Sequence, residues 1–112
     1  MPAAAEVRPE KWTNVTDLFD NGWYSLISGV YDEDDTQRVL GERWNGGESD
    51  PQGFPKLFGH PVWHVVPRFL DIAILHALLD ELAARPNAVP SPDSLQRYRT
   101  AILGELEVRL GG

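Results

Sequence analysis

The chain has 112 residues, of which 42% are hydrophobic and 24% are charged, and it carries a net charge of −7 with no cysteine. This length suffices for one hydrophobic core but not for two independent domains. The missing cysteine excludes thiol nucleophiles, thiolate zinc sites and redox switching. The acidic balance argues against a nucleic-acid partner, which would need clustered Lys and Arg.

The sequence shows neither a targeting signal nor a membrane anchor. Residues 1–6 lack the basic segment and apolar run of a signal peptide. The longest apolar stretch, 69–84, is interrupted by acidic and histidine side chains and is shorter than the roughly 20 residues that span a bilayer. We therefore expect a cytoplasmic protein with no membrane partner, in which residues 1–12 are a loose lead-in.

The first predicted element is an amphipathic helix from Thr13 to Val30. Its apolar residues recur at steps of three and four, as Val15, Leu18, Phe19, Trp23, Leu26, Ile27 and Val30. This spacing is typical of a helix with one face packed on a core. Gly22 and Gly29 disfavour a helix, so a strand over 23–31 is the alternative.

A strand is predicted next, over residues 38–45. Alternation would place Leu40 and Trp44 on one face and Val39 and Arg43 on the other. A helical turn that ends at Gly41 is the alternative.

Residues 46–61 are rich in glycine and proline and predict a long loop. The short apolar segment 62–66 is bracketed by Pro61 and Pro67 and predicts a second strand.

Two helices are predicted to close the chain. Residues 68–85 are apolar around most of the helical wheel, which places this helix at the centre of the domain or at an interface. Ser91 and Pro92 fit the cap and the first residue of the next helix. A narrow apolar stripe then runs to the C-terminus through Leu95, Tyr98, Ile102, Leu106 and Leu110.

Together these elements predict a small single α+β domain over residues 1–112. The expected order is helix, strand, strand, helix, helix, with a short antiparallel sheet packed by the helices. A two-stranded sheet is marginal alone, and the apolar helix offers more surface than its neighbours cover. We therefore expect a homodimer, in which a second copy completes the sheet.

The histidines do not predict a metal or catalytic site. His60 and His64 have the spacing of two ligands on a helix face, but Pro61 makes this segment extended and separates them by about 13 Å. His76 and Asp80 form at best half of an acid–base pair, because no serine lies in a nucleophile elbow. We expect no metal, no cofactor and no catalytic residue, and a His–Asp hydrolase is the least favoured hypothesis.

One candidate interaction site is the acidic run of Asp32, Glu33, Asp34 and Asp35. Residues 1–50 carry eleven acidic and four basic side chains, so the whole acidic excess lies in this half. The run does not continue as a calcium loop, because Gln37 and Arg43 stand where glycine and a bidentate glutamate are required. It predicts either a surface for a basic protein partner or a solvated segment that only aids solubility.

The other candidate site is the segment 44–64, where four aromatic residues stand among glycines and prolines: Trp44, Phe54, Phe58 and Trp63. Large aromatics in a long loop cover the core, meet a partner or line a pocket. For a pocket, the candidate ligand-binding residues are Trp44, Asn45, Phe58, His60, Trp63 and His64.

The sequence therefore predicts a small acidic domain with a non-enzymatic binding or protein-interaction function. A small-molecule-binding protein that uses the aromatic segment is the alternative.

Overall fold

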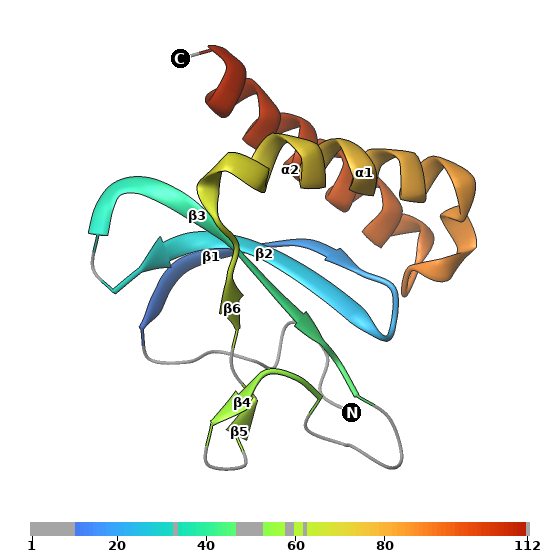
Figure 1. Ribbon diagram of the computed structural model, residues 1–112. Coiled ribbons are helices and arrows are strands. Elements are labelled where there is room, and N and C mark those ends of the chain that lie inside the picture. Colours follow the sequence, from blue (N-terminus) through green and yellow to red (C-terminus); the bar gives the residue numbers. More distant parts are fainter. Residues whose placement is uncertain (1–10, 33, 47–52, 58–59, 62, 112) are drawn as a thin grey trace.

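The computed structural model describes residues 11–32, 34–46, 53–57, 60–61 and 63–111 (Figure 1). They form an antiparallel sheet with strand order β1-β2-β3-β6, a separate β4-β5 hairpin and two long helices. The strands are β1 (Trp12–Asp20), β2 (Tyr24–Tyr31), β3 (Asp34–Trp44), β4 (Lys56–Leu57), β5 (His60–Pro61) and β6 (His64–Val65). The helical segments are η2 (Arg68–Leu70), α1 (Asp71–Ala84), η3 (Pro86–Ala88) and α2 (Pro92–Gly111). The α+β class is confirmed.

The predicted helix over 13–30 is wrong, because this segment is the β1-β2 hairpin. The alternative of a strand over 23–31 is correct, since β2 covers 24–31. The predicted strand over 38–45 is also confirmed, because Gly41 lies within β3 rather than at the end of a helical turn. Residue 12 also belongs to β1, so the lead-in is shorter than expected. The chain order therefore begins strand, strand, strand.

Two features of the hairpin imitate helical spacing. A register shift in β1 between Asp17 and Phe19 lets the adjacent Leu18 and Phe19 both enter the same core, which regular alternation would forbid. In β2 both faces are buried, so Leu26 packs under the helices while Ile27 packs on the opposite side. Apolar pairs four residues apart thus arise from a bulge and a two-sided sheet rather than from a helix.

The sheet face opposite the helices carries its own small core of Trp12, Ile27 and Trp63. The indole of Trp12 lies across β2 and β3 where both strands have glycine. A Cβ at Gly41 would stand 2.8 Å from this ring, and one at Gly29 would stand 3.1 Å from it. Gly41 is therefore needed for the close approach of Trp12 to the sheet.

The face assignment within β3 is confirmed. Leu40 belongs to the core under the helices, whereas Val39 packs on the Trp12 side and Arg43 lies over the ring of Trp63. The predicted strand at 62–66 is present in shorter form as β6, which pairs with Gly41 and Glu42 of β3. The predicted loop 46–61 contains the β4-β5 hairpin among its described residues.

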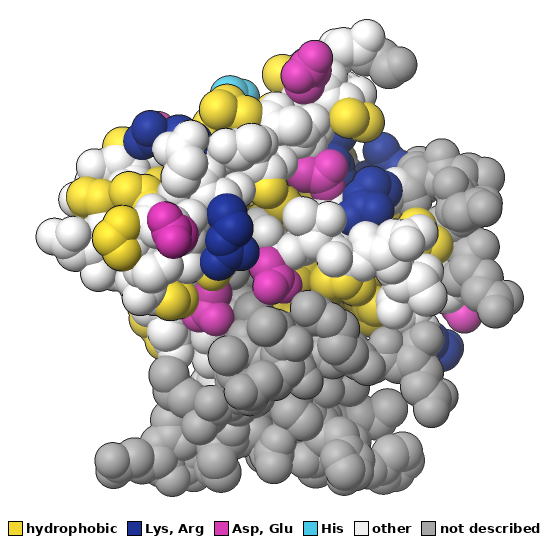
Figure 2. All heavy atoms as spheres, turned by 180° about the vertical axis from the view of Figure 1, so that it is seen from behind, with side chains coloured by type: hydrophobic (Ala, Val, Ile, Leu, Met, Phe, Trp, Pro, Cys, Tyr) yellow, Lys and Arg dark blue, Asp and Glu magenta, His cyan; other side chains and the backbone are white. Residues whose placement is uncertain are grey.

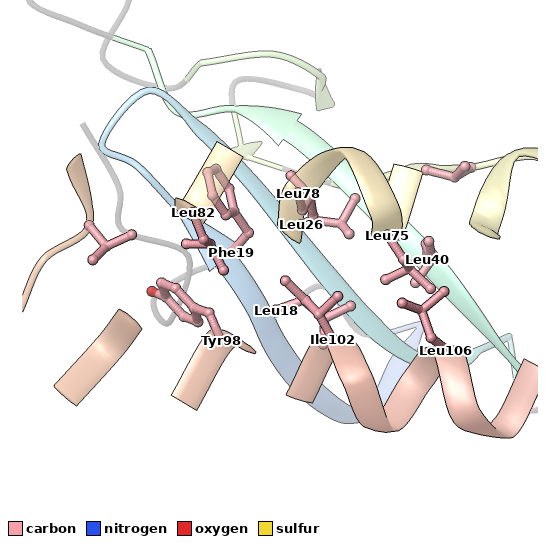
Figure 3. Close-up of a cluster of buried hydrophobic side chains, with 12 residues drawn as sticks. Leu18, Phe19, Leu26, Leu40, Leu75, Leu78, Leu82, Tyr98, Ile102 and Leu106 are labelled. Atoms are coloured by element: carbon pink, nitrogen blue, oxygen red, sulfur yellow. The ribbon is translucent and has the colours of Figure 1, made fainter. Parts of the chain in front are cut away.

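The main core fills the space between the sheet and the two helices (Figure 3). The sheet contributes four large side chains, namely Leu18, Phe19, Leu26 and Leu40. The helices contribute Leu75, Leu78, Leu82, Tyr98, Ile102 and Leu106. The predicted start of α2 is confirmed, since Ser91 Oγ accepts a hydrogen bond from the Ser94 amide at 3.1 Å.

Only one side of α1 is buried, although its sequence is apolar nearly all round. Leu75, Leu78 and Leu82 face the core, while Ile72 in the first turn of α1 and Phe69 in the preceding η2 are exposed. Seen from behind, the described surface carries acidic and basic side chains interspersed with hydrophobic ones (Figure 2). Within the described ranges no helix has the length and apolar character to cross a membrane.

Candidate functional site

The helices cover only part of the sheet end at which β2 begins and β3 ends, where Trp44 remains exposed. The helix-facing side of the sheet presents four side chains here that the strand register places on one face: Tyr24, Glu42, Trp44 and His64. The C-terminal half of α1 faces Tyr24 and Trp44 across a hollow. We refer to this partly open end of the sheet as the ledge.

Aromatic side chains occupy this ledge. We refer to Trp23, Tyr24, Trp44 and Phe54 as the aromatic surface. The rings of Trp23 and Trp44 are stacked, with centroids 4.9 Å apart and planes at 13°, and Tyr24 meets Trp44 edge-on at 5.1 Å. Trp23 is 58% exposed, Trp44 46% and Phe54 60%. Large aromatics rarely gather in solvent without a binding role.

The β1-β2 turn holds Trp23 in place through polar side chains. Asp20 Oδ1 accepts a hydrogen bond from the Gly22 amide at 2.9 Å, and Gly22 has the positive φ of 99° that a tight turn needs. Asn21 Oδ1 accepts from the amides of Trp23 and Tyr24 at 3.2 and 2.9 Å. These bonds orient the turn so that Trp23 lies over Trp44.

Asn45 ties that turn to the end of β3. Its backbone amide donates to the carbonyl of Trp23 at 2.7 Å. Its side-chain Nδ2 donates to Asp20 Oδ1 at 3.1 Å, while its Oδ1 accepts from Ser25 Oγ at 2.8 Å. The Asn45 side chain is buried, so this geometry supports a role in positioning the aromatic surface rather than in direct contact with a ligand.

Phe54 reaches the ledge from the other direction, after the segment that follows β3. Trp44 and Phe54 exchange two backbone hydrogen bonds of 2.6 and 2.8 Å. Gly53 makes this approach possible, because its φ is +71° and a Cβ there would lie 2.0 Å from the Trp44 carbonyl oxygen. The peptide bond between Phe54 and Pro55 is cis.

Two hollows flank Trp44 and Tyr24. The first, of about 600 Å³, lies between the aromatic surface and the end of α1, where Ala77, Leu78, Glu81 and Arg85 line it. The second, of about 300 Å³, lies toward Phe54 and Pro55 and is also lined by Glu42 and His64. The two hollows share Tyr24 and Trp44 as lining residues.

The predicted ligand-binding residues do not form one group in space. Trp44 lies at the centre of the aromatic surface, and His64 is exposed beside it with Nδ1 3.4 Å from Glu42 Oε2. Trp63 is buried on the opposite face of the sheet. Phe58 lies outside the described residues, and His60 is described only through its backbone in β5.

Trp23, Tyr24 and Glu42 were missed as site residues. The helix prediction over 13–30 concealed Trp23 and Tyr24, since it made Trp23 a member of a buried apolar helix face and hid the pairing of Tyr24 with β3. The available signal was the sequence Asn21-Gly22, which commonly forms the turn of a β-hairpin and would have placed Trp23 just after that turn.

The acidic run lies at the other end of the β2-β3 hairpin from the aromatic surface (Figure 1). Asp32 is exposed in the turn with φ of 55°, and Asp34 and Asp35 begin β3, with their side chains undescribed. Glu33 lies outside the described residues. Seven residue steps along β2, roughly 23 Å, separate Tyr24 from Tyr31, the residue before the run, so the two candidate sites are distinct.

The histidine–carboxylate pair lies apart from both hollows. His76 and Asp80 are exposed on α1, and neither lines the spaces around the aromatic surface. Among the described residues, no group of three or more His, Asp or Glu side chains is arranged to hold a metal ion.

Tyr24 links this site to the stability of the domain. Its phenol donates a 2.8 Å hydrogen bond to Glu42 Oε1. Burial raises the pKa of Tyr24 well above its ordinary value of 10.0, and the hydrogen bond and negative charge of Glu42 raise it further. The hydroxyl therefore remains protonated where an exposed tyrosine would ionise.

We expect alkaline pH to destabilise the domain partly through Tyr24. The unfolded chain releases this proton near the ordinary pKa while the folded chain retains it, so the stabilising contribution is complete below about pH 10 and declines above it. Urea unfolding at a series of pH values measures this decline. Tyr24→Phe should show a shallower decline than the parent protein. Tyr98, whose pKa is also raised by burial, contributes to the decline in both the parent protein and the variant. An equal loss of stability with pH in the two proteins would contradict the prediction.

Comparisons with protein-family models, with curated proteins and with solved structures find no match to this chain.

Proposed function

We propose that this chain is a non-enzymatic protein-interaction domain that binds a short segment of a partner protein on the aromatic surface. The observation that carries the proposal is the exposure of Trp23, Trp44 and Phe54 side by side at one end of the sheet. Tryptophan and other aromatic residues dominate the binding energy of many protein interfaces. A cytoplasmic location is part of the proposal, because the chain has no cysteine with which to form the disulfides of many secreted small domains.

The rigidity of the surface supports this proposal. Trp23 follows a turn held by four side-chain hydrogen bonds from Asp20, Asn21 and Asn45, and Phe54 is paired with β3 through its backbone. A preorganised surface loses little conformational entropy when it binds. The aromatic rings are therefore presented in one arrangement before a partner arrives.

The shape favours an extended ligand. The two hollows are open and lie on either side of Trp44 and Tyr24, so a continuous chain can pass from one to the other across the aromatic rings. Aromatic-lined grooves of this kind are a recurrent way to recognise extended peptides.

The experiment selects peptides from a phage-displayed random library with the whole chain as bait and measures a selected, labelled peptide by fluorescence anisotropy. Trp23→Ala and Phe54→Ala should each weaken binding by about tenfold or more. Both side chains are largely exposed, so the variants should remain folded. Phe69→Ala is the matched control, because Phe69 is 86% exposed on η2, outside the aromatic surface. Equal binding by all three variants, or no enriched peptide, would contradict the proposal.

A small-molecule-binding protein remains the alternative function. The first hollow, at about 600 Å³, falls within the size range of ligand pockets. This alternative makes a different prediction for the binding of aromatic fragments, measured by NMR. Ala77→Trp should fill the hollow and abolish fragment binding. Phe54→Ala should leave fragment binding unchanged, because Phe54 does not line this hollow.

We further propose that copies of this chain associate. The exposed apolar residues at the start of α1 and the end of α2 support this proposal, namely Phe69, Leu70, Ile72, Val108 and Leu110. The ion pair between Asp71 and Arg109 shows that these two helix ends lie together. A second copy that covers them would remove this apolar area from water.

A further inference from the structure

The second hollow combines aromatic walls with a carboxylate. Tyr24, Trp44 and Phe54 line it together with Glu42, and we refer to this space as the Glu42 hollow. Trp44 and Phe54 remain about half exposed, and the side chain of Glu42 is 33% exposed. The ring faces and the carboxylate are therefore accessible to the same incoming group.

Tyr24 orients this carboxylate. Its hydroxyl donates to Glu42 Oε1, which leaves Oε2 directed to the side of His64, 3.4 Å from Nδ1. The raised pKa of Tyr24 keeps the phenol a neutral donor, so Tyr24 adds no second negative charge. The hollow thus presents one negative charge at a fixed position beside three aromatic rings.

We propose that the Glu42 hollow binds a positively charged side chain, arginine or lysine, of the partner segment. The inference rests on the proposed function and adds the chemistry of the residue recognised. A cation over an aromatic face is attracted by the ring quadrupole, and a neighbouring carboxylate adds a charge-assisted hydrogen bond. The aliphatic part of either side chain packs against the exposed rings.

The net charge of the chain favours a cation over an anion. The chain has a net charge of −7, and its acidic excess lies in residues 1–50, which include Glu42. Arg43, although it contributes to the lining, directs its guanidinium to the opposite face of the sheet, where it lies over Trp63. His64 is the neighbouring side chain that competes with an incoming cation for Glu42 when it is protonated.

The test uses N-acetylated, C-amidated arginine, lysine and norleucine as probes, titrated into the isotopically labelled chain. Arginine or lysine should shift the indole resonance of Trp44, and uncharged norleucine should not. Which of the two cations shifts it more identifies the preferred side chain. Glu42→Gln should weaken this binding by about tenfold, because it removes the charge while keeping the acceptor for Tyr24. Glu81→Gln is the matched control, with an equally exposed carboxylate in the first hollow.

A second variant protects the test against misfolding of Glu42→Gln. His64 is exposed, so His64→Lys should fold normally and place a permanent cation beside Glu42. It should weaken binding of the charged probes several-fold through direct competition. Raising the salt concentration from 0.1 to 1 M shortens the Debye length from about 10 to about 3 Å, so it should also weaken binding of the charged probes to the parent protein.

The outcomes separate this inference from the proposed function. Selected peptides that bind the aromatic surface without any basic residue, and equally well to Glu42→Gln, would overturn the inference and leave the function standing. Charged probes that shift Trp44 without any enriched peptide would support the cation site and overturn the function. Loss of binding on changing Asp32, Asp34 and Asp35 to Asn, with Glu42→Gln unaffected, would assign charge recognition to the acidic run and overturn the inference.

Discussion

Leu75→Asp should unfold the domain at room temperature. Leu75 is fully buried between α1 and the sheet, in contact with the main core (Figure 3). Removal of a buried leucine side chain costs about 2 to 5 kcal/mol, and an unpaired carboxylate in its place costs several kcal/mol more. A domain of this size has about 5 to 15 kcal/mol of stability in total. Circular dichroism and the dispersion of NMR resonances measure the loss of structure.

Phe69→Asp is the control for this prediction. It introduces the same charge on a side chain that is exposed, so the variant should remain folded. It also tests self-association, because Phe69 belongs to the exposed apolar residues that we propose a second copy covers. Sedimentation of the parent protein as a 12.5 kDa monomer would contradict the proposed association, whereas a dimer that Phe69→Asp dissociates would support it. A folded Leu75→Asp would show that α1 packs on the sheet differently.

The C-terminal half of the fold is predictable from sequence because its patterns have one cause. Proline and serine mark the start of α2, and one buried stripe explains the spacing of Tyr98, Ile102 and Leu106. The N-terminal half is not predictable in this way, because two separate structural features together produce the spacing of its apolar residues. A bulge at Leu18 and Phe19 and burial of both faces of β2 together reproduce steps of three and four. The spacing of apolar residues alone cannot distinguish such a hairpin from an amphipathic helix.

The candidate site is only partly predictable for a related reason. Trp44 stands out in the sequence because of the glycines that follow it, and it does lie at the centre of the aromatic surface. Trp23 and Phe54 reach it through pairing across the sheet, from 21 residues earlier and ten residues later in the chain. The buried Trp63 has a similar local composition, and only the register of β6 with β3 places it on the opposite face.

The second large effect is expected at an ion pair that joins both helices to the sheet. Arg109, in the last turn of α2, donates through Nε to Asp71 Oδ2 at 2.9 Å, and both side chains are almost fully buried. Glu105 lies 3.6 Å from Arg109 and 3.6 Å from Arg38 of β3. Asp71 is the first residue of α1, where a negative charge also interacts favourably with the helix dipole.

Arg109→Met should therefore destabilise the domain by about 3 to 5 kcal/mol, because it leaves Asp71 charged, buried and without its main partner. Arg85→Met is the matched control: Arg85 pairs with Glu81 at the surface, and loss of such a pair costs only about 0.3 to 0.5 kcal/mol. Urea unfolding measures both. The double variant Asp71→Asn with Arg109→Met should lose less stability than the sum of the losses of the two single variants. In the double variant both charges of the pair are removed, so no buried charge is left without its partner. Additive losses would instead mean that each residue stabilises the helix ends through separate contacts, Arg109 with Glu105 and Asp71 with the first turn of α1.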